Sequence, residues 1–422
     1  MNIQSLLPAL ALSLAAASTA QAEDSTTIAA PAFIERLANE AARTHPKAQA
    51  AKERTEAARA AIGAVRLWED PQASLGFMAA RKSMRQDDGD IVTGIDQMLP
   101  RVGLYKAEKR KAEADFHARG AAIQLTANEL GLSVAQATLE LALSDEIIGL
   151  QSENIHWLET TVRTAEERAK NPDASSTETL RLQGELAMRQ QALVVAQKKR
   201  GQFARTLNLL LGRGMEAVWQ PLSLPANTST LPSLAALKVR LERMNPQLAA
   251  MRHMADGAQA EADAAQQRKK PIFSVGIESS TFSGGDQRST LFMVRMSLPW
   301  FNRSAYQADI AKVEQMRQAA QSDLAAEQRE LYTQLTALMT DAESNQQLVI
   351  SYSKDVLPKM EKAVETLQNA WISSKATLLE VLDARRTLLD ARQEQKRALA
   401  AGHVAYHSLS AITGSLAKPA AK

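Results

Sequence analysis

The sequence predicts a mainly α-helical, internally duplicated protein with a small β part. The 422 residues include 4% aromatic residues and no cysteine, and they are rich in Ala, Leu, Gln and charged residues that favour helices. Landmarks of the first half of the chain recur in the second half, and apolar residues recur at every seventh position over long stretches. These patterns favour long helices packed side by side over one compact core.

Composition also excludes several classes of protein. A chain without cysteine forms no disulfide, no thiolate metal site and no cysteine nucleophile, and we expect no lipid anchor on a cysteine. The formal net charge of +3 is too small to indicate a nucleic-acid partner. Beyond the N-terminus, no apolar run reaches the length of about 18 residues that a membrane-spanning helix needs.

Residues 1–22 have the features of a secretory signal peptide. The stretch from Leu6 to Ala17 is almost wholly apolar, and Ala20-Gln21-Ala22 provides a small-x-small cleavage pattern before Glu23. No Lys or Arg precedes the apolar stretch, so the alternative is a short buried helix. We expect export, and a bacterial envelope protein suits this composition.

The chain is predicted to be a tandem duplication. Five landmarks recur in order at an offset of about 200 residues: His45-Pro46 with Asn245-Pro246, Pro71 with Pro271, 75–77 with 275–277, Leu99-Pro100 with Leu298-Pro299, and 207–212 with 409–414. The predicted repeats span 23–212 and 233–414. A linker or equatorial segment with three prolines lies between them at 213–232, and a tail follows at 415–422.

Each repeat has the same predicted order of elements. An Ala-rich helical stretch is followed by two strands, a very long helix and a shorter helix. In the first repeat these are 31–66, about 72–80 and 91–99, about 104–170, and 177–211; in the second they are 233–268, about 272–280 and 291–298, about 305–371, and 377–412.

The predicted strands have one apolar and one polar face. In the last strand, Phe292, Val294, Met296 and Leu298 lie on one face, and Met293, Arg295 and Ser297 on the other. Such strands suit a membrane barrel, because lipid contacts one face and water the other. The alternative, a sandwich strand on a protein core, is disfavoured because four strands in a mostly helical chain neither close a barrel nor cover themselves. Closure therefore requires more than one chain.

The ends of the strands differ in composition. The tips at 81–90 and 279–290 are polar, as outward loops should be. At the opposite end, Trp68, Trp300, Phe301 and Tyr306 are expected either to form an interfacial girdle or to pack at a strand–helix junction.

The long helices carry two apolar stripes with a seven-residue period. One includes Leu141, Ile148, Ile155 and Val162, and the second repeat has Ile350, Leu357, Val364 and Trp371. A helix of about 67 residues is roughly 100 Å long. Pro358 is predicted to kink the second long helix.

Residues 376–389, Ala-Thr-Leu-Leu-Glu-Val-Leu-Asp-Ala-Arg-Arg-Thr-Leu-Leu, resemble the C-terminal helix-turn segment of the TolC family of outer-membrane efflux proteins. The duplication, the two strands per repeat and the long helices are similar to that family over nearly the whole mature chain. Asp70-Pro71 and the segment from Gln97 to Gly103 resemble its heavy-metal, CzcC- and CusC-like branch.

The resemblance implies a homotrimer in the outer membrane, with four strands per protomer in a twelve-stranded β-barrel and a trimeric α-barrel tunnel in the periplasm. It implies a passive duct without cofactor or enzymatic activity, docked on a periplasmic adaptor (membrane fusion protein) and an inner-membrane RND-type pump. Heavy-metal cations are the expected substrate. The alternatives are drug or organic-solute efflux, type I secretion, and a structural coiled-coil envelope protein that needs no barrel.

The resemblance also implies candidate residues at the periplasmic mouth. Glu380 and Asp383 share a helix face near the start of the last helix, where three-fold repetition would create acidic rings that favour cations. The alternative is that they merely complement the helix dipole. Glu178 and Arg181 occupy the matching positions of the first repeat, where an ion pair would help to close the tip.

Two further groups of residues are candidates. The turns expected to contact the adaptor include Asn171, Pro172, Asp173 and Ser175 in one hairpin and Ser373, Ser374 and Lys375 in the other. His403 and His407 have the i, i+4 spacing of a divalent-metal pair, but no third ligand is near, so packing or capping is favoured.

Overall fold

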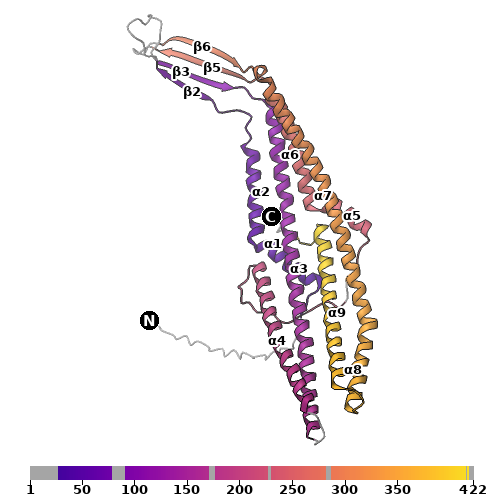
Figure 1. Cartoon of the computed structure of the whole chain (residues 1–422). Helices are drawn as coiled ribbons and strands as arrows, with labels where there is room; N and C mark the ends of the chain where they lie inside the picture. The colour runs from indigo at the N-terminus through magenta and orange to yellow at the C-terminus, as the bar shows by residue number, and fades with distance from the viewer. Residues whose placement is uncertain are drawn as a thin grey trace, which may run out of the picture.

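The computed structural model describes residues 27–77, 91–170, 176–226, 230–281, 287–414 and 416–417. Long helices run side by side along one axis, and a sheet leans away from one end of them (Figure 1). The predicted signal peptide, the loop at 81–90 and most of the tail at 415–422 lie outside the described residues. The elongated shape agrees with the mainly helical fold class predicted from the sequence.

Both halves of the chain have the same order of elements. The first contains α1 (Pro31–Thr44), α2 (Pro46–Ala64), β2 (Gln72–Phe77), β3 (Ile91–Met98), α3 (Val102–Ala169) and α4 (Ser176–Leu211). The second contains α5 (Leu234–Met244), α6 (Pro246–Arg268), β5 (Phe273–Thr281), β6 (Gln287–Met296), η1 (Pro299–Asn302), α7 (Arg303–Ser351), η2 (Tyr352–Val356), α8 (Leu357–Ile372) and α9 (Leu378–Ile412). Two short strands, β1 (Thr27–Ile28) and β4 (Leu222–Ser223), pair in parallel. The internal duplication is therefore visible in three dimensions.

The Ala-rich stretch at the start of each half is two helices, where the sequence predicted one. The break falls at His45 and at Asn245, each of which precedes a proline and has extended backbone angles. A residue before proline avoids the helical region, and proline fits the first turn of a new helix. Asn245 also caps that new helix, because its side-chain oxygen accepts a hydrogen bond of 2.8 Å from the amide of Leu248.

The second long helix is likewise interrupted, where the sequence predicted a continuous helix at 305–371. The π-helical turn η2 separates α7 from α8, and Pro358 stands in the first turn of α8. Proline has no amide hydrogen to donate within a helix, and a π-helical turn absorbs such a fault in the hydrogen-bond ladder. The irregularity expected at Pro358 therefore takes the form of a local π-helical turn.

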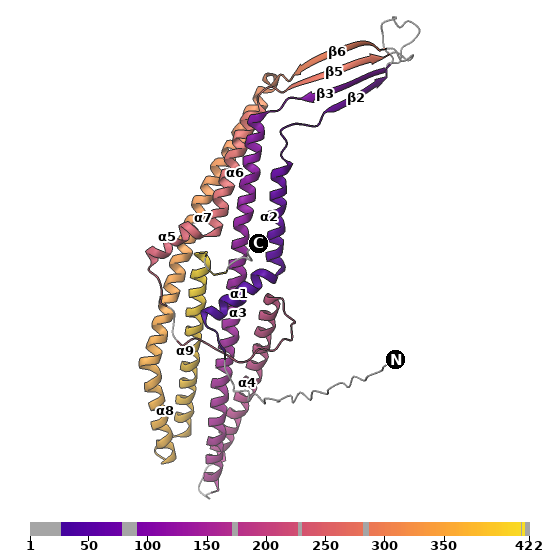
Figure 2. The same cartoon turned by 180° about the vertical axis from the view of Figure 1, so that it is seen from behind.

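The four longer strands form one antiparallel sheet in the order β2-β3-β5-β6. Each half of the chain supplies one hairpin, and β3 pairs with β5 so that Ile95 lies opposite Ile277. Among the described strands, β2 and β6 each have a single neighbour. Figure 2 shows the sheet from behind, continuing from α2, α3, α6 and α7. The pairing of β3 with β5 fixes the two halves of the chain beside each other.

The main core lies at the middle of the helices. Leu139 and Leu141 of α3 pack there with Ile34 of α1 and Leu207 of α4, and all four side chains are buried. Leu222 of the inter-repeat segment joins the same cluster. The segment predicted as a linker thus also contributes to the core.

Glycines end the last helix of each half. Gly212 follows α4 with φ of +70°, and Gly414 follows α9 with φ of +77°. Positive φ at the end of a helix favours glycine, which has no Cβ. The need for positive φ explains why a glycine occupies the matching position in both repeats.

We predict that Gly414→Ala destabilises the protein more than Gly212→Ala. Both substitutions place a side chain at positive φ, which costs about 1 kcal/mol. At Gly414 a Cβ would also lie 2.2 Å from the carbonyl oxygen of Met244, whereas at Gly212 the nearest atom is 3.7 Å away. Circular dichroism during heating of the detergent-solubilised variants should give a lower melting temperature for Gly414→Ala. Equal losses would contradict this explanation.

Candidate functional site

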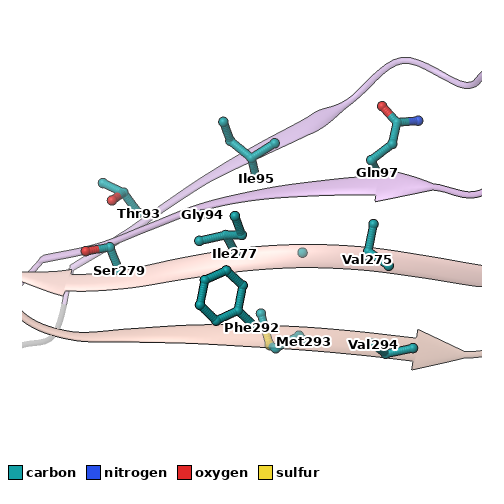
Figure 3. Close-up of a pocket in the computed structure, with 11 residues that line it drawn as sticks. Thr93, Gly94, Ile95, Gln97, Val275, Ile277, Ser279, Phe292, Met293 and Val294 are labelled. Carbon is teal, nitrogen blue, oxygen red and sulfur yellow. The ribbon is translucent and has the colours of Figure 1, made fainter.

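One face of the sheet is apolar and uncovered. The strand register places Ile95 beside Ile277, and Ile277 beside Phe292. Phe292 is 75% exposed and Val294 is 76% exposed. Figure 3 shows these side chains around a hollow of about 780 Å³ on this face. Such a face is typical of a surface that contacts lipid or another protein.

The opposite face of the sheet is polar. Arg295 on β6 forms an ion pair with Asp96 on β3, and the Ser274 hydroxyl donates a hydrogen bond of 3.3 Å to the same carboxylate. A Cβ at Gly276 would lie 2.9 Å from that carboxylate, so the Asp96 side chain occupies the space beside this glycine. The alternation predicted from the sequence for β6 therefore holds, with Arg295 on the polar side.

Aromatic side chains gather where the strands meet the helices. Trp68, Trp300 and Phe301 are all exposed, and Phe301 is 78% exposed. Their exposure disfavours packing within the chain as an explanation for these three residues. No helix in the described ranges is long and apolar enough to cross a membrane.

The opposite end of the molecule is formed by the ends of α3, α4, α8 and α9 (Figure 1). An ion-pair network joins the two halves of the chain here. Glu185 on α4 is almost fully buried, pairs with Arg386 on α9, and accepts a hydrogen bond of 2.8 Å from Arg189. Burial works to raise the pKa of Glu185, but the hydrogen bonds from Arg386 and Arg189 outweigh it and hold that pKa below its usual value.

A second contact between the halves involves Arg168 near the end of α3. Its guanidinium lies 4.5 Å from the ring centroid of Trp371 and donates hydrogen bonds of 3.2 Å to the carbonyl oxygen of Trp371. It also donates to the carbonyl oxygen of Ile372. Arg168 thereby adds side-chain donors to carbonyl groups in the last turn of α8, where the regular helical hydrogen bonds end.

The predicted acidic residues at the mouth have different environments. Glu380 forms a capping box with Thr377, and the Thr377 amide donates a hydrogen bond of 2.8 Å to its carboxylate. This amide, followed by the Thr377 hydroxyl, lowers the pKa of Glu380. Asp383 is exposed one turn later, close enough for Coulombic attraction to Arg386. Glu380 thus has a structural role at the start of α9.

The matching residues of the first repeat do not form an ion pair with each other. Glu178 is half-buried and Arg181 is exposed on α4. Among the described residues at this end, Glu185 pairs with Arg386 and Arg189, and Lys170 pairs with Glu167 at the end of α3. The contact between the hairpins is therefore made by residues that the sequence did not indicate.

The turn between α8 and α9 has a defined hydrogen-bond pattern. The Ser374 amide donates to the carbonyl oxygen of Trp371 and the Lys375 amide to that of Ala370, as in a Schellman motif. Ser374 has φ of 56°, so a serine occupies a position that favours glycine. Ser373 and Lys375 are exposed beside it. The predicted contacts of the other hairpin, Asn171, Pro172, Asp173 and Ser175, lie outside the described residues.

His403 and His407 lie in the helical core near the inter-repeat segment, each 2% exposed. The Nε2 atom of His403 is 3.2 Å from the carbonyl oxygen of Pro225. Burial, followed by repulsion from His403, lowers the pKa of His407 to about 4. No group of three His, Asp or Glu side chains in the described residues is placed to hold a metal ion. The arrangement agrees with packing, the alternative favoured from the sequence.

Residues 238–415 match the model of the family described as outer membrane efflux protein. The chain carries a domain of the outer membrane efflux protein family. The match spans the second repeat and confirms the family resemblance carried by residues 376–389. A search of curated protein sequences finds no significant match.

Solved structures are similar to this chain over most of its length. CusC is 18% identical with a TM-score of 0.79, and the alignment covers 90% of this chain and 92% of that chain. VceC from Vibrio cholerae is 17% identical with a TM-score of 0.76, covering 91% and 96%. The outer-membrane channel OprN is 16% identical with a TM-score of 0.78, covering 91% and 90%. These likenesses confirm the predicted fold class, and the family is one of channels and not of enzymes.

We predict that Glu185→Gln loosens the helical tip of the protein. The substitution leaves Arg386 and Arg189 without their buried counter-charge, which costs about 1–3 kcal/mol. The melting temperature of the detergent-solubilised protein at pH 7 should fall, whereas the control Glu178→Gln should change it little. Because the pKa of Glu185 is lowered by folding, its contribution is present above the ordinary glutamate pKa of about 4.3 and lost as the pH falls below it. The difference in melting temperature between Glu185→Gln and the unmodified protein should therefore shrink at pH 3. A difference in melting temperature that is independent of pH would contradict the ionised role assigned to Glu185.

Proposed function

We propose that the protein is the outer-membrane exit duct of a tripartite efflux system. Three copies assemble around one axis, and each contributes four strands to a twelve-stranded β-barrel and its long helices to a periplasmic tunnel. The duct catalyses nothing, and its energy comes from an inner-membrane pump. The observation that carries the proposal is the sheet of the described strands, which has an uncovered apolar face and two open edges.

The open edges favour assembly with further copies of the chain. Each edge strand, β2 or β6, has a row of backbone groups without a partner among the described strands. In lipid, each unsatisfied backbone group costs several kcal/mol, so a membrane sheet must close on itself. Pairing β2 of one copy with β6 of the next satisfies both edges and closes the barrel. The resemblance to the TolC family supplies the number three.

The two faces of the sheet fit this assembly. The face of Ile277 and Phe292 would contact lipid, and the face of Asp96 and Arg295 would line the water-filled interior. Exposed Trp300 and Phe301 would lie at the membrane interface, where aromatic side chains are stabilised. We infer export through the signal peptide at 1–22 and an unlipidated protein in the outer membrane.

The helical tip is the proposed docking surface for a periplasmic adaptor, which connects the duct to an RND-type pump. The exposed turn at Ser373, Ser374 and Lys375 is the described part of that surface. The buried contacts of Glu185 and Arg168 behind it hold the two hairpins of one chain in a defined position.

Heavy-metal cations are the proposed substrate. The resemblance of Asp70-Pro71 and of 97–103 to the metal branch supports this, together with the likeness to CusC. OprN has a nearly equal TM-score, so drug or organic-solute efflux remains the second candidate, and type I secretion the third. The match to an efflux family disfavours a structural coiled-coil protein without a channel.

Fractionation and growth assays test the proposed function. The protein should be recovered from the outer membrane as a detergent-stable trimer, and a deletion strain should become sensitive to heavy-metal cations. Sensitivity to organic drugs alone would favour the second candidate. Recovery as a soluble periplasmic monomer would contradict the duct itself.

We further predict that Asp383 contributes to cation preference at the mouth. The double variant Glu380→Gln, Asp383→Asn removes both charges, while glutamine at position 380 still completes the capping box. The reversal potential across a planar bilayer with a salt gradient should shift away from cation preference, because an acidic ring favours cations. Glu178→Gln, at the matching position of the first repeat, is the comparison variant. An unchanged reversal potential in the double variant would assign both residues to the helix end alone.

A further inference from the structure

Two histidines face each other across the seam between α3 and α6, away from the helical tip and from the sheet. The ring centroids of His117 on α3 and His253 on α6 are 5.3 Å apart, and the rings are tilted by 33°. His117 is exposed, and the side chain of His253 is 39% exposed. The pair is therefore accessible to small solutes.

The seam brings these two side chains together because the helices pack closely and in a fixed register. Lys111 pairs with Glu261 at 2.7 Å. One turn along, a Cβ at Gly257 would lie 3.5 Å from that of Ala114, so small residues allow a close approach. His117 and His253 are the next contacting pair on the same seam. The packing of the two helices thus places the two histidines opposite each other on the seam.

The geometry of the pair suits a shared metal ion. Imidazole nitrogen binds Zn²⁺ at about 2.0–2.1 Å, so two rings on one tetrahedral ion have centroids about 5 Å apart. The observed 5.3 Å agrees with that separation. Imidazole is a preferred ligand of Zn²⁺, Cu²⁺ and Ni²⁺, whereas Mg²⁺ and Ca²⁺ prefer oxygen.

A carboxylate is placed to orient one of the imidazoles. The Oδ2 atom of Asp256 lies 3.7 Å from Nδ1 of His253. This is an ion-pair distance and is longer than a hydrogen bond. A carboxylate that hydrogen-bonds one ring nitrogen of a metal-bound histidine holds the ring and leaves the other nitrogen for the metal, and Asp256 is the carboxylate placed to take that part. His253 also lines a hollow of about 330 Å³ between α3, α6 and α7, which gives access from solvent.

We propose that His117 and His253 form a binding site for a borderline divalent transition-metal ion such as Zn²⁺, Cu²⁺ or Ni²⁺. Within the described residues no three His, Asp or Glu side chains are grouped to hold a metal. The site therefore has two protein ligands, with Asp256 as the orienting group, and water completes the coordination. The ion would bridge α3 and α6, and the site does not depend on which cargo the duct exports.

Calorimetric titration of the full-length, detergent-solubilised protein with Zn²⁺ tests the proposal. Zn²⁺ should bind and raise the melting temperature, since the ion joins two helices, and Mg²⁺ should do neither. His117→Ala and His253→Ala should each weaken Zn²⁺ binding at least tenfold and abolish the rise in melting temperature. Asp256→Asn should weaken binding by about tenfold while keeping some of the rise.

His156→Ala is the matched control, because His156 is an exposed histidine on the same helix α3. It should leave Zn²⁺ binding unchanged. Unaltered binding in a double His117→Ala, His253→Ala variant, or an equal loss in His156→Ala, would overturn the proposed site. Because the readout is binding, failure of the site is distinguishable from failure of the export function.

Discussion

The pairing of β3 with β5 is the constraint on which the rest of the structure depends. It joins hairpins from the two halves of the chain into one sheet, with Ile95 opposite Ile277. The helices attached to those strands, α3 after β3 and α6 before β5, must then run next to each other in opposite directions. The seam of Lys111 with Glu261, and of His117 with His253, follows from that placement.

The two ends of the molecule differ in how completely one chain satisfies its own buried and polar groups. At the sheet, burial is incomplete within one chain, and backbone edges and apolar side chains remain uncovered. At the helical tip, the chain satisfies its buried charge internally, with Glu185 held by Arg386 and Arg189. The uncovered sheet suits assembly with further copies in a membrane. The helical tip, whose buried charge is already paired, suits the proposed contact with an adaptor.

Regular patterns made the helices, the strand positions and the duplication predictable from the sequence, because each depends on residues close together along the chain. The breaks before Pro46 and Pro246 also follow from a local rule, because a residue before proline avoids the helical region. The contact of Glu185 with Arg386 is different, since it joins two repeats. Its partners are set by how the helices pack, and a single sequence contains no pattern that pairs a particular Glu with a particular Arg. The sequence likewise predicts an irregularity at Pro358, but it does not predict that the irregularity is a π-helical turn.

The contact of Arg168 with the end of α8 has a consequence for rotational symmetry. Two identical repeats in three copies would give six equivalent hairpins around an axis. The second repeat has Ala370 at the position that matches Arg168, so it has no guanidinium to offer in return. The two hairpins are thus inequivalent, because the first donates hydrogen bonds from Arg168 and the second accepts them at the end of α8. The mouth of the proposed trimer therefore has three-fold symmetry only.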